Sequence, residues 1–410
     1  MLATLIPLFD ADLAVKAYSI FAQKENYFLH PKYSGFSKLD GANRVTGLDL
    51  IDVMGMETIS GELDIFVPVT EVSLYAELDE QCGAPHDKLV LLIDRAVTPN
   101  ENNISRIKEL KAQGYRFAMR KLMGADFENY KVIISEMDYI FINPKKMQIS
   151  RADEFFRKAY PDIKICVVGI KDFDEYEDIT AQGRYDLYEG SFFRLPLTKG
   201  NNAEMAPLKT TYIEMLNVVN EKDYDLTKAA EVLERDPALV VSLLNIVNRM
   251  TVVSGINSVQ HAVAMLGQKE LKRWIVTAVT RELCTDRPSE VMRLSLLRAK
   301  FADNLAELFG LKHMKGELFL MGLFSVLDKI LDRTIDEALK EVKVSKEIYQ
   351  CLVDGEGPLA EVYEFMKDYE EAYWPEVSRI MLLKQIEVAD VYDAYKGSLN
   401  WYRLLLPTKP

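Results

Sequence analysis

The stretch LVLLIDRAVTPNENNISRIKELKAQGYRFAM, at residues 89–119, joins two short apolar runs through a segment of helical periodicity. The runs at 89–94 and 116–119 predict buried strands. Between them, apolar residues recur at three-residue steps over 101–113 and Gly114 can end a helix there. A strand, a helix and a second strand in this order predict a parallel sheet with its helices outside.

The same alternation extends over the first 200 residues. We expect an α/β domain of the compact (β/α) TIM-like barrel type, followed by an all-α domain. An open doubly wound sheet is the alternative, but no glycine-rich loop follows the first strand. The segments before Pro7 and after Asp12 can pair as a hairpin, which predicts an antiparallel start to the barrel. The other strand-like runs lie at 3–9, 64–69, 138–143, 164–170 and 185–193.

Helical periodicity dominates after residues 197–207, LTKGNNAEMAP, which read as a linker. We therefore predict a barrel domain at 1–198 and a helical domain at 199–410. Asp225, Asp236 and Ser258 are expected to cap helices, and Gly267 to end the helix that begins after Ser258. Further helices are predicted at 288–309, 317–331, 334–341, 345–352, 358–371 and 375–395.

The composition is that of an ordinary soluble globular protein. Of the 410 residues, 50 are Lys or Arg and 63 are Asp or Glu, which gives a net charge of −13. Both halves are acidic, so binding to nucleic acid or to an anionic membrane surface is disfavoured. The first residues lack the basic start of a signal peptide, and four dispersed cysteines fit a reducing compartment. We expect a cytoplasmic protein.

The histidines do not form a metal-binding motif. The dipeptide His86-Asp87 is typical of metal phosphohydrolases, but it lies in the turn GAPHDKL with no second histidine near it in the sequence. A His/Asp metal site needs further ligands from neighbouring helices, so a surface turn is the favoured interpretation. The other histidines are His30, His261 and His313. His261 is expected to be a capping or partly buried residue rather than a ligand, and the loop GLKHMKG around His313 has no partner motif.

Chemistry in a (β/α) barrel belongs at the carboxyl ends of the strands. The basic pair Arg120 and Lys121 can bind an anion there, although adjacent strand residues point to opposite faces and only one can face the mouth. A salt-bridged rim is the favoured interpretation. We predict no catalytic, metal-binding or cofactor-binding residue, and no cofactor. The strand-end residues are Pro68, Asp94, Arg95, Arg120, Lys121, Asn143, Lys171 and Glu189.

The second half resembles the HDOD domain of bacterial signalling proteins. The matching runs are DYDLTKAAEVLERDPALVVSLLNIVN (223–248), INSVQHAVAMLGQKELKRWIV (256–276) and MGLFSVLD (321–328). In hydrolytic relatives the last of these would carry the HD dyad. Ser325 and Val326 stand there, so the resemblance implies no metal chemistry.

The first half is similar to the EAL domain, the cyclic di-GMP phosphodiesterase barrel, in its fused EAL–HDOD form. The similarity is clearest at IPLFDADLAVKAYSIFAQ (6–23), RIKELKAQGYRFAM (106–119), DYIFIN (138–143) and RYDLYEGSFFRLP (184–196).

The resemblance implies that the EAL ligands have been replaced. Ser19 occupies the position of a metal-binding Glu. Arg120 and Lys121 occupy the positions of an Asp pair, and Phe141 occupies that of the catalytic Lys. Two carboxylates exchanged for two cations reverse the local charge, and the expectation is a degenerate, inactive EAL domain. The other replaced positions are Gln23 (Arg), Pro68 (Asn), Leu92 (Glu), Asn143 (Asp), Ile170 (Glu) and Glu189 (Gln).

The function predicted is that of a non-catalytic signal-transduction adaptor that contacts unidentified protein partners, with pairing into a homodimer left open. The alternative is a receptor that binds cyclic di-GMP or another anionic nucleotide through Arg120 or Lys121 without hydrolysing it. An active phosphodiesterase with shifted ligands and a nucleotide hydrolase in the helical half fit less well. The aromatic C-terminus, residues 392–407, is either a partner surface or, as favoured, a segment folded onto the helical core.

Overall fold

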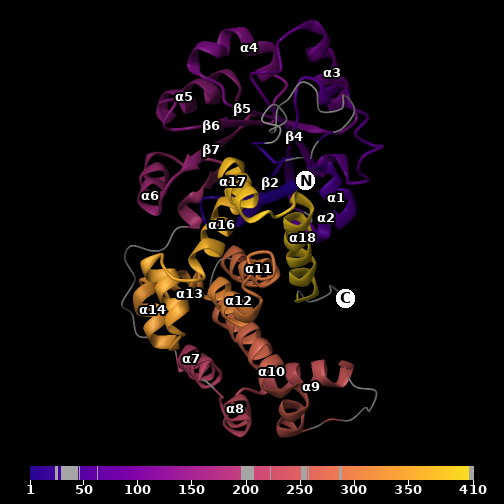
Figure 1. Cartoon of the computed structure of the whole chain (residues 1–410). Helices are drawn as coiled ribbons and strands as arrows, with labels where there is room; N and C mark the ends of the chain where they lie inside the picture. Colours follow the sequence, from indigo (N-terminus) through magenta and orange to yellow (C-terminus); the bar gives the residue numbers. More distant parts are fainter. Residues whose placement is uncertain are drawn as a thin grey trace. The chain divides into compact units, whose positions relative to one another are not determined.

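The computed structural model (Figure 1) describes residues 1–23, 26–28, 45, 47–61, 63–194, 207–221, 223–250, 256, 258–285 and 289–405. His30 and nearly all of the predicted linker at 197–207 lie outside these ranges. The chain forms two compact units. The barrel unit comprises Met1–Leu195, Glu307–Gly310 and Glu364–Pro410, and the helical unit comprises Pro196–Ala306 and Leu311–Tyr363.

Eight strands close into a barrel in the order of the sequence. Strand β1 pairs antiparallel with both β2 and β8, and the other neighbours are parallel. The (β/α) barrel and its antiparallel hairpin start are thus confirmed, and the open sheet is wrong. The strands are β1 Leu2–Phe9, β2 Val15–Gln23, β3 Asp64–Pro68, β4 Leu89–Asp94, β5 Arg116–Arg120, β6 Tyr139–Ile142, β7 Lys164–Ile170 and β8 Leu187–Gly190.

Alternate strand residues fill the inside of the barrel, as the pleat requires. The interior cluster includes Val90 and Leu92 of β4 and Ala118 of β5. Helices surround the strands (Figure 1): α1 Leu48–Met54, α2 Met56–Ser60, α3 Glu101–Ala112, α4 Phe127–Ile134, α5 Ile149–Ala159 and α6 Phe173–Gln182. The predicted helix at 101–113 is α3, and its N-cap Asn100 accepts the N–H of Asn103.

The C-terminal segment from Glu364 onward belongs to the barrel unit, whereas the predicted boundary at residue 198 places it in the helical domain. Helix α16 spans Ala360–Glu370, α17 spans Trp374–Lys384 and α18 spans Val388–Leu405. Helix α18 packs on β1 and α2, as Figure 1 shows. Apolar periodicity predicts a buried helix face but does not say which core that face joins. The predicted helix at 375–395 is broken at Gln385, whose φ is 58°.

The helical unit contains the other helices, and the predicted all-α character of this region is confirmed. Asp225, Asp236 and Ser258 accept backbone N–H groups at the starts of their helices, as expected. Gly267, with a φ of 69°, interrupts α10. The helices are α7 Pro207–Asn220, α8 Leu226–Leu233, α9 Pro237–Met250, α10 Val259–Leu283, α11 Ser289–Leu305, α12 Lys315–Phe324, α13 Leu327–Leu331, α14 Ile335–Val342 and α15 Lys346–Tyr349, followed by a π turn at Gln350–Asp354.

Candidate functional site

Two charged residues end neighbouring strands at the mouth of the barrel. Asp94 is the last residue of β4, Arg120 is the last residue of β5, and the two are register partners. Leu92 and Ala118, two positions earlier, belong to the interior cluster, so strand alternation directs Asp94 and Arg120 to the inside as well. Asp94 is 7% exposed and Arg120 is 8% exposed. Two buried residues of opposite charge thus sit where the barrel interior ends.

The guanidinium of Arg120 is a buried cation on which two carboxylates act electrostatically. Burial lowers the pKa of Arg120, and the charges of Asp94 and Glu189 oppose that shift. Burial likewise raises the pKa of Glu189, with Arg120 and Arg194 opposing. The guanidinium also lies over the ring of Phe21, 5.4 Å from its centroid. Because arginine keeps its proton in proteins, the mouth holds a permanent positive charge.

Lys121 follows directly and turns back toward the same carboxylate. Its φ of 59° is in the left-handed region, and its Nζ lies 3.2 Å from Oδ2 of Asp94. The expectation that only one residue of the basic pair can face the mouth is therefore wrong. Strand alternation ends at Arg120, and the left-handed backbone of Lys121 brings its ammonium group, the second cation of the basic pair, to Asp94. The Lys121 side chain is 49% exposed.

The positions that the EAL resemblance assigns to metal and nucleotide contacts lie along the barrel strands and their ends. Ser19, Gln23 and Ile170 are buried, and Leu92 and Phe141 belong to the interior cluster. Pro68 ends β3, and Asn143 follows β6 and accepts the N–H of Lys145 with its side chain. Among the described residues, no group of three or more His, Cys, Asp and Glu side chains is placed to hold a metal ion.

The His86-Asp87 dipeptide has a structural environment. It lies in a 3₁₀ turn, His86–Lys88, before β4. The Nδ1 of His86 lies 2.7 Å from the carbonyl oxygen of Gln113, and its Nε2 lies 2.7 Å from Asp79. The ring stacks on Tyr115 at 4.2 Å. Both ring nitrogens are thus occupied, one by Gln113 at the end of α3 and the other by Asp79. His261 lies in the first turn of α10, where its N–H bonds to Ser258.

A second buried cation lies where the HDOD resemblance places the HD dyad. Ser325 and Val326 separate α12 from α13, so the helix predicted at 317–331 is broken there. Oγ of Ser325 accepts a hydrogen bond from Nη1 of Arg298 at 3.1 Å and donates one to the carbonyl of Gly322 at 2.7 Å. Arg298 is 1% exposed. Asp328 is buried beside it and pairs with Lys329 at 3.3 Å.

This helical core matches a known domain family. Residues 205–348 match the HDOD domain. The sequence resemblance of this region to HDOD domains is thereby confirmed, and the HDOD domain covers α7 to α14 and most of α15.

Two curated proteins are similar over most of the chain. The chain is 25% identical to the uncharacterized protein YuxH of Bacillus subtilis, over 98% of each chain. It is 24% identical to the cyclic di-GMP phosphodiesterase CdgJ of Vibrio cholerae, over 77% of this chain and 74% of that protein.

Solved structures similar to part of the chain include EAL proteins. The EAL domain of Mycobacterium smegmatis DcpA is 15% identical with a TM-score of 0.34, over 46% of this chain and 89% of that chain. A standalone EAL protein of Vibrio cholerae, in its c-di-GMP bound form, is 12% identical with a TM-score of 0.35, over 46% and 89%.

The HDOD domain also contains a cavity that sequence reasoning missed. Its volume is about 890 Å³, and it is lined by residues from α7, α10, α11, α12, α15 and the segments between them. His313, for which no partner motif was found, is one of them. The lining residues are spread over 129 positions, from Asn220 to Ile348, so no compact motif exists in the sequence. The local feature of the sequence that points to this cavity is the clustering of Lys and Arg residues at 269–273 and 312–315.

Proposed function

We propose that the barrel is a degenerate EAL domain without phosphodiesterase activity, and that the protein acts as a signalling adaptor. The observation that supports this most directly is the buried cation of Arg120 at the barrel mouth, on which the charges of Asp94 and Glu189 act.

The chemistry of divalent cations opposes catalysis at this mouth. Mg²⁺ and Mn²⁺ require several oxygen ligands, mostly carboxylates. Asp94 already pairs with Lys121 at 3.2 Å, and the charges of Asp94 and Glu189 both act on the buried Arg120 cation. A buried charge without compensation costs several kcal/mol, so these carboxylates are required to compensate the buried Arg120 cation. A divalent ion would enter a region with two fixed positive charges.

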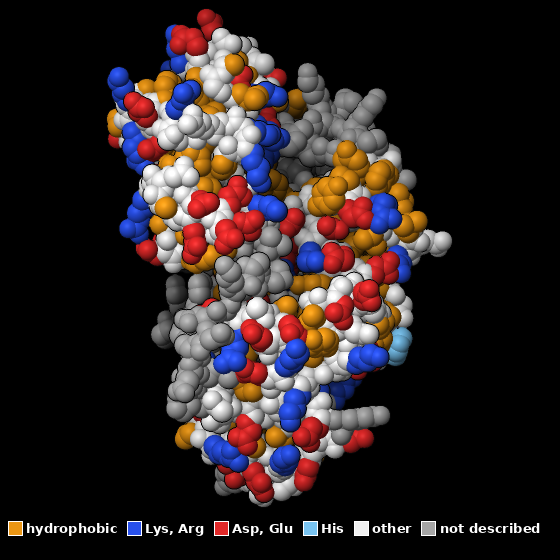
Figure 2. Space-filling model, turned by 90° about the vertical axis from the view of Figure 1, so that its left-hand side faces the viewer, with side chains coloured by type: hydrophobic (Ala, Val, Ile, Leu, Met, Phe, Trp, Pro, Cys, Tyr) orange, Lys and Arg blue, Asp and Glu red, His pale blue; other side chains and the backbone are white. Residues whose placement is uncertain are grey.

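The adaptor role follows from what the chain retains. The barrel closes with an apolar interior, whereas the positions at which the EAL resemblance expects metal ligands carry other residues. Such a fold offers a surface for protein partners, and this step rests on analogy with signalling relatives. On the face shown in Figure 2, acidic and basic side chains are interspersed, which does not favour a polyanion such as nucleic acid. Among the described residues, no helix combines the length and apolar character needed to cross a membrane.

One observation favours the receptor alternative. Lys121 and Arg120 bring two positive charges to one mouth, and the Lys121 side chain is half exposed. Against it, Arg120 is turned inward over Phe21 and Lys121 is held by Asp94. An incoming phosphate would have to break both arrangements.

The test is calorimetric titration of the whole protein with cyclic di-GMP, with and without Mg²⁺ or Mn²⁺, followed by product analysis. CdgJ serves as the active control. No heat and no linear product are expected. Tight binding without product, lost in Arg120→Glu or Lys121→Glu but kept in Arg151→Glu on the outer helix α5, would establish the receptor alternative. Turnover comparable to that of CdgJ would refute the degenerate barrel.

A further inference from the structure

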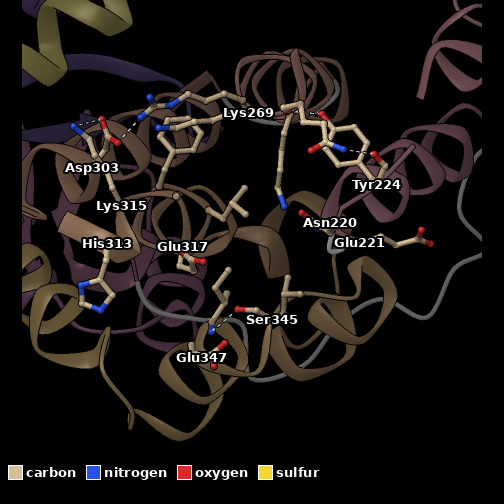
Figure 3. A pocket seen from close by; sticks show the side chains of 18 of the residues that line it. Asn220, Glu221, Tyr224, Lys269, Asp303, His313, Lys315, Glu317, Ser345 and Glu347 are labelled. Atoms are coloured by element: carbon tan, nitrogen blue, oxygen red, sulfur yellow. Dashed lines mark hydrogen bonds and ion pairs between the residues drawn. The ribbon is translucent and has the colours of Figure 1, made fainter. Parts of the chain in front are cut away.

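The cavity of the HDOD domain has the size of a small-molecule site. Its 890 Å³ lies within the roughly 300–1,000 Å³ that is usual for ligand pockets. Figure 3 shows Asp303 and Lys315 at one side of the view and Tyr224 and Asn220 at the other, with Glu317 and Ser345 between them. All of these residues belong to the helical unit.

One end of the cavity has an excess of positive charge. The carboxylate of Asp303 is fully buried and meets three cations. It pairs with Arg273, with Lys300 at 2.7 Å and with Lys315 at 3.9 Å. A single carboxylate cannot neutralise three cations, and two of them, Arg273 and Lys315, also line the cavity. This end can therefore stabilise a further anion.

The rest of the same wall adds to this excess. Lys272 is partly buried, so that burial lowers its pKa, and Glu317 opposes the shift. An anion in the cavity would favour the charged form of this lysine further. Helix α10 and the segment 312–315 thus provide five lining cations against the two carboxylates of Asp303 and Glu317. The lining cations are Lys269, Lys272, Arg273, Lys312 and Lys315.

Backbone donors accompany these side chains. Helix α12 begins at Lys315, and its N-cap Met314 makes no side-chain capping bond. The second part of α10 begins after Gly267, where Gln268 and Lys269 line the cavity. Helix N-termini carry unsatisfied N–H groups and a partial positive charge, which favours anions. Combined with the lysines, they give the donor set that binds phosphate groups.

The facing wall has the opposite character. It carries the carboxylates of Asp223 and Glu347, together with the polar side chains of Asn220 and Ser345, whereas the carboxylate of Glu221 pairs with Lys228 at 3.8 Å. Carboxylates accept hydrogen bonds from hydroxyl and amino groups, and they repel a second phosphate. The cavity is therefore polarised from a phosphate-binding wall to a wall that accepts donors.

We propose that this cavity binds a phosphorylated small molecule, with its phosphate at the wall formed by Lys272, Arg273 and Lys315 and its hydroxyl or amino groups toward Glu347. Sugar phosphates and nucleotides share this chemistry. The site lies in the HDOD domain and does not depend on the function proposed for the barrel.

Calorimetry and thermal unfolding of the full-length protein test the proposal, with inorganic phosphate, glucose 6-phosphate and AMP as probes. Glucose and adenosine are the unphosphorylated controls. Saturable binding of the phosphorylated probes is expected, with no binding of the controls. Tighter binding of glucose 6-phosphate than of AMP would identify a sugar phosphate site, and the reverse order a nucleotide site. If neither binds more tightly than inorganic phosphate, the acidic wall does not accept the hydroxyl or amino groups of the ligand, and that part of the proposal is wrong.

Variants locate the site. Lys315→Met and Lys272→Met should each weaken binding at least tenfold, whereas Lys340→Met, on the surface of α14, should not change it. Circular dichroism checks folding, and the more exposed Lys269→Met replaces Lys272→Met if the latter unfolds. Arg151→Glu, on the outer helix α5 of the barrel unit, should leave phosphate binding intact. Absence of phosphate binding, or equal binding in the Lys315 and Lys340 variants, would overturn the proposal.

Discussion

The hydroxyl of Tyr369 donates to the carbonyl oxygen of Ala3 at 2.8 Å and accepts the N–H of the same residue at 3.2 Å. Both residues are buried, and they are separated by 366 positions in the chain. One phenol thus satisfies both backbone groups of a β1 residue, and the C-terminal helices become part of the barrel unit.

Tyr369→Phe should destabilise the barrel unit by about 2 kcal/mol, because it leaves a buried N–H and a buried C=O without this partner. Urea unfolding followed by circular dichroism measures the shift in midpoint. Tyr373→Phe, which removes a hydroxyl from an exposed ring three residues after the end of α16, is the matched control and should be neutral. Equal effects of the two variants would show that the contact with Ala3 does not hold the unit together.

Arg120→Met should cost about 3 kcal/mol at pH 7, since it leaves Asp94 and Glu189 without the buried cation that compensates them. The cost should shrink as the pH falls toward 5. Burial already raises the pKa of Glu189 against the opposing charge of Arg120, and without that charge the carboxyl takes up a proton more readily.

The double variant Arg120→Met/Glu189→Gln checks this explanation. Removing the carboxylate that has lost its cation should restore part of the stability, which gives a positive coupling in a double-mutant cycle. Strictly additive losses would mean that the two side chains do not interact in the folded barrel.

Asp368→Asn should stabilise the protein at neutral pH. Burial, and then the charges of Glu376, Glu364 and Glu371, raise the pKa of Asp368 to about 6. A raised carboxyl pKa contributes stability that is complete below its unfolded value and is lost as the pH rises through about 6. The asparagine resembles the protonated form, so we expect a gain of about 1 kcal/mol above pH 7, reduced by solvent screening, and no difference below pH 4.

Chemical denaturation at pH 4, 6 and 8 measures this profile. The exposed Asp87→Asn is the control for the loss of one negative charge from the acidic protein as a whole. A gain for Asp368→Asn that is the same at all three pH values would contradict a titration near 6.

Local patterns in the sequence predicted the elements well, because strand and helix periodicity and capping residues act within a few positions. The runs at 89–94 and 116–119 became adjacent strands, and their ends brought Asp94 and Arg120 together. The fold class and the hairpin start followed from the same patterns.

Non-local contacts were beyond these patterns. The partner of Tyr369 lies at the other end of the chain, so helical periodicity alone could not assign α17 and α18 to the barrel. The break at Gln385 has no glycine or proline to mark it. At the mouth, the left-handed backbone of Lys121 overrode strand alternation. The HDOD cavity combines side chains from separate helices, which only the packing of those helices brings together.

Two glycines of α12 provide a final test of how closely this helix packs. A Cβ added at Gly322 would lie within 3 Å of backbone atoms of Arg298 and Ala299 in α11. The backbone cannot yield as the end of a side chain can, so Gly322→Ala should destabilise the HDOD domain by about 3 kcal/mol. A Cβ at Gly316 in the same helix would meet nothing within 4 Å, and Gly316→Ala should be neutral or stabilising by up to about 1 kcal/mol.

Thermal unfolding of the two alanine variants separates packing from helix propensity. Both variants exchange a glycine for the better helix former alanine, but only the new Cβ at position 322 contacts α11. Gly322→Ala should also shift the Arg298–Ser325 contact, which spans the same helix pair. Nearly equal melting temperatures for the two variants would mean that α11 and α12 are not packed as closely as the backbone distances at Gly322 require.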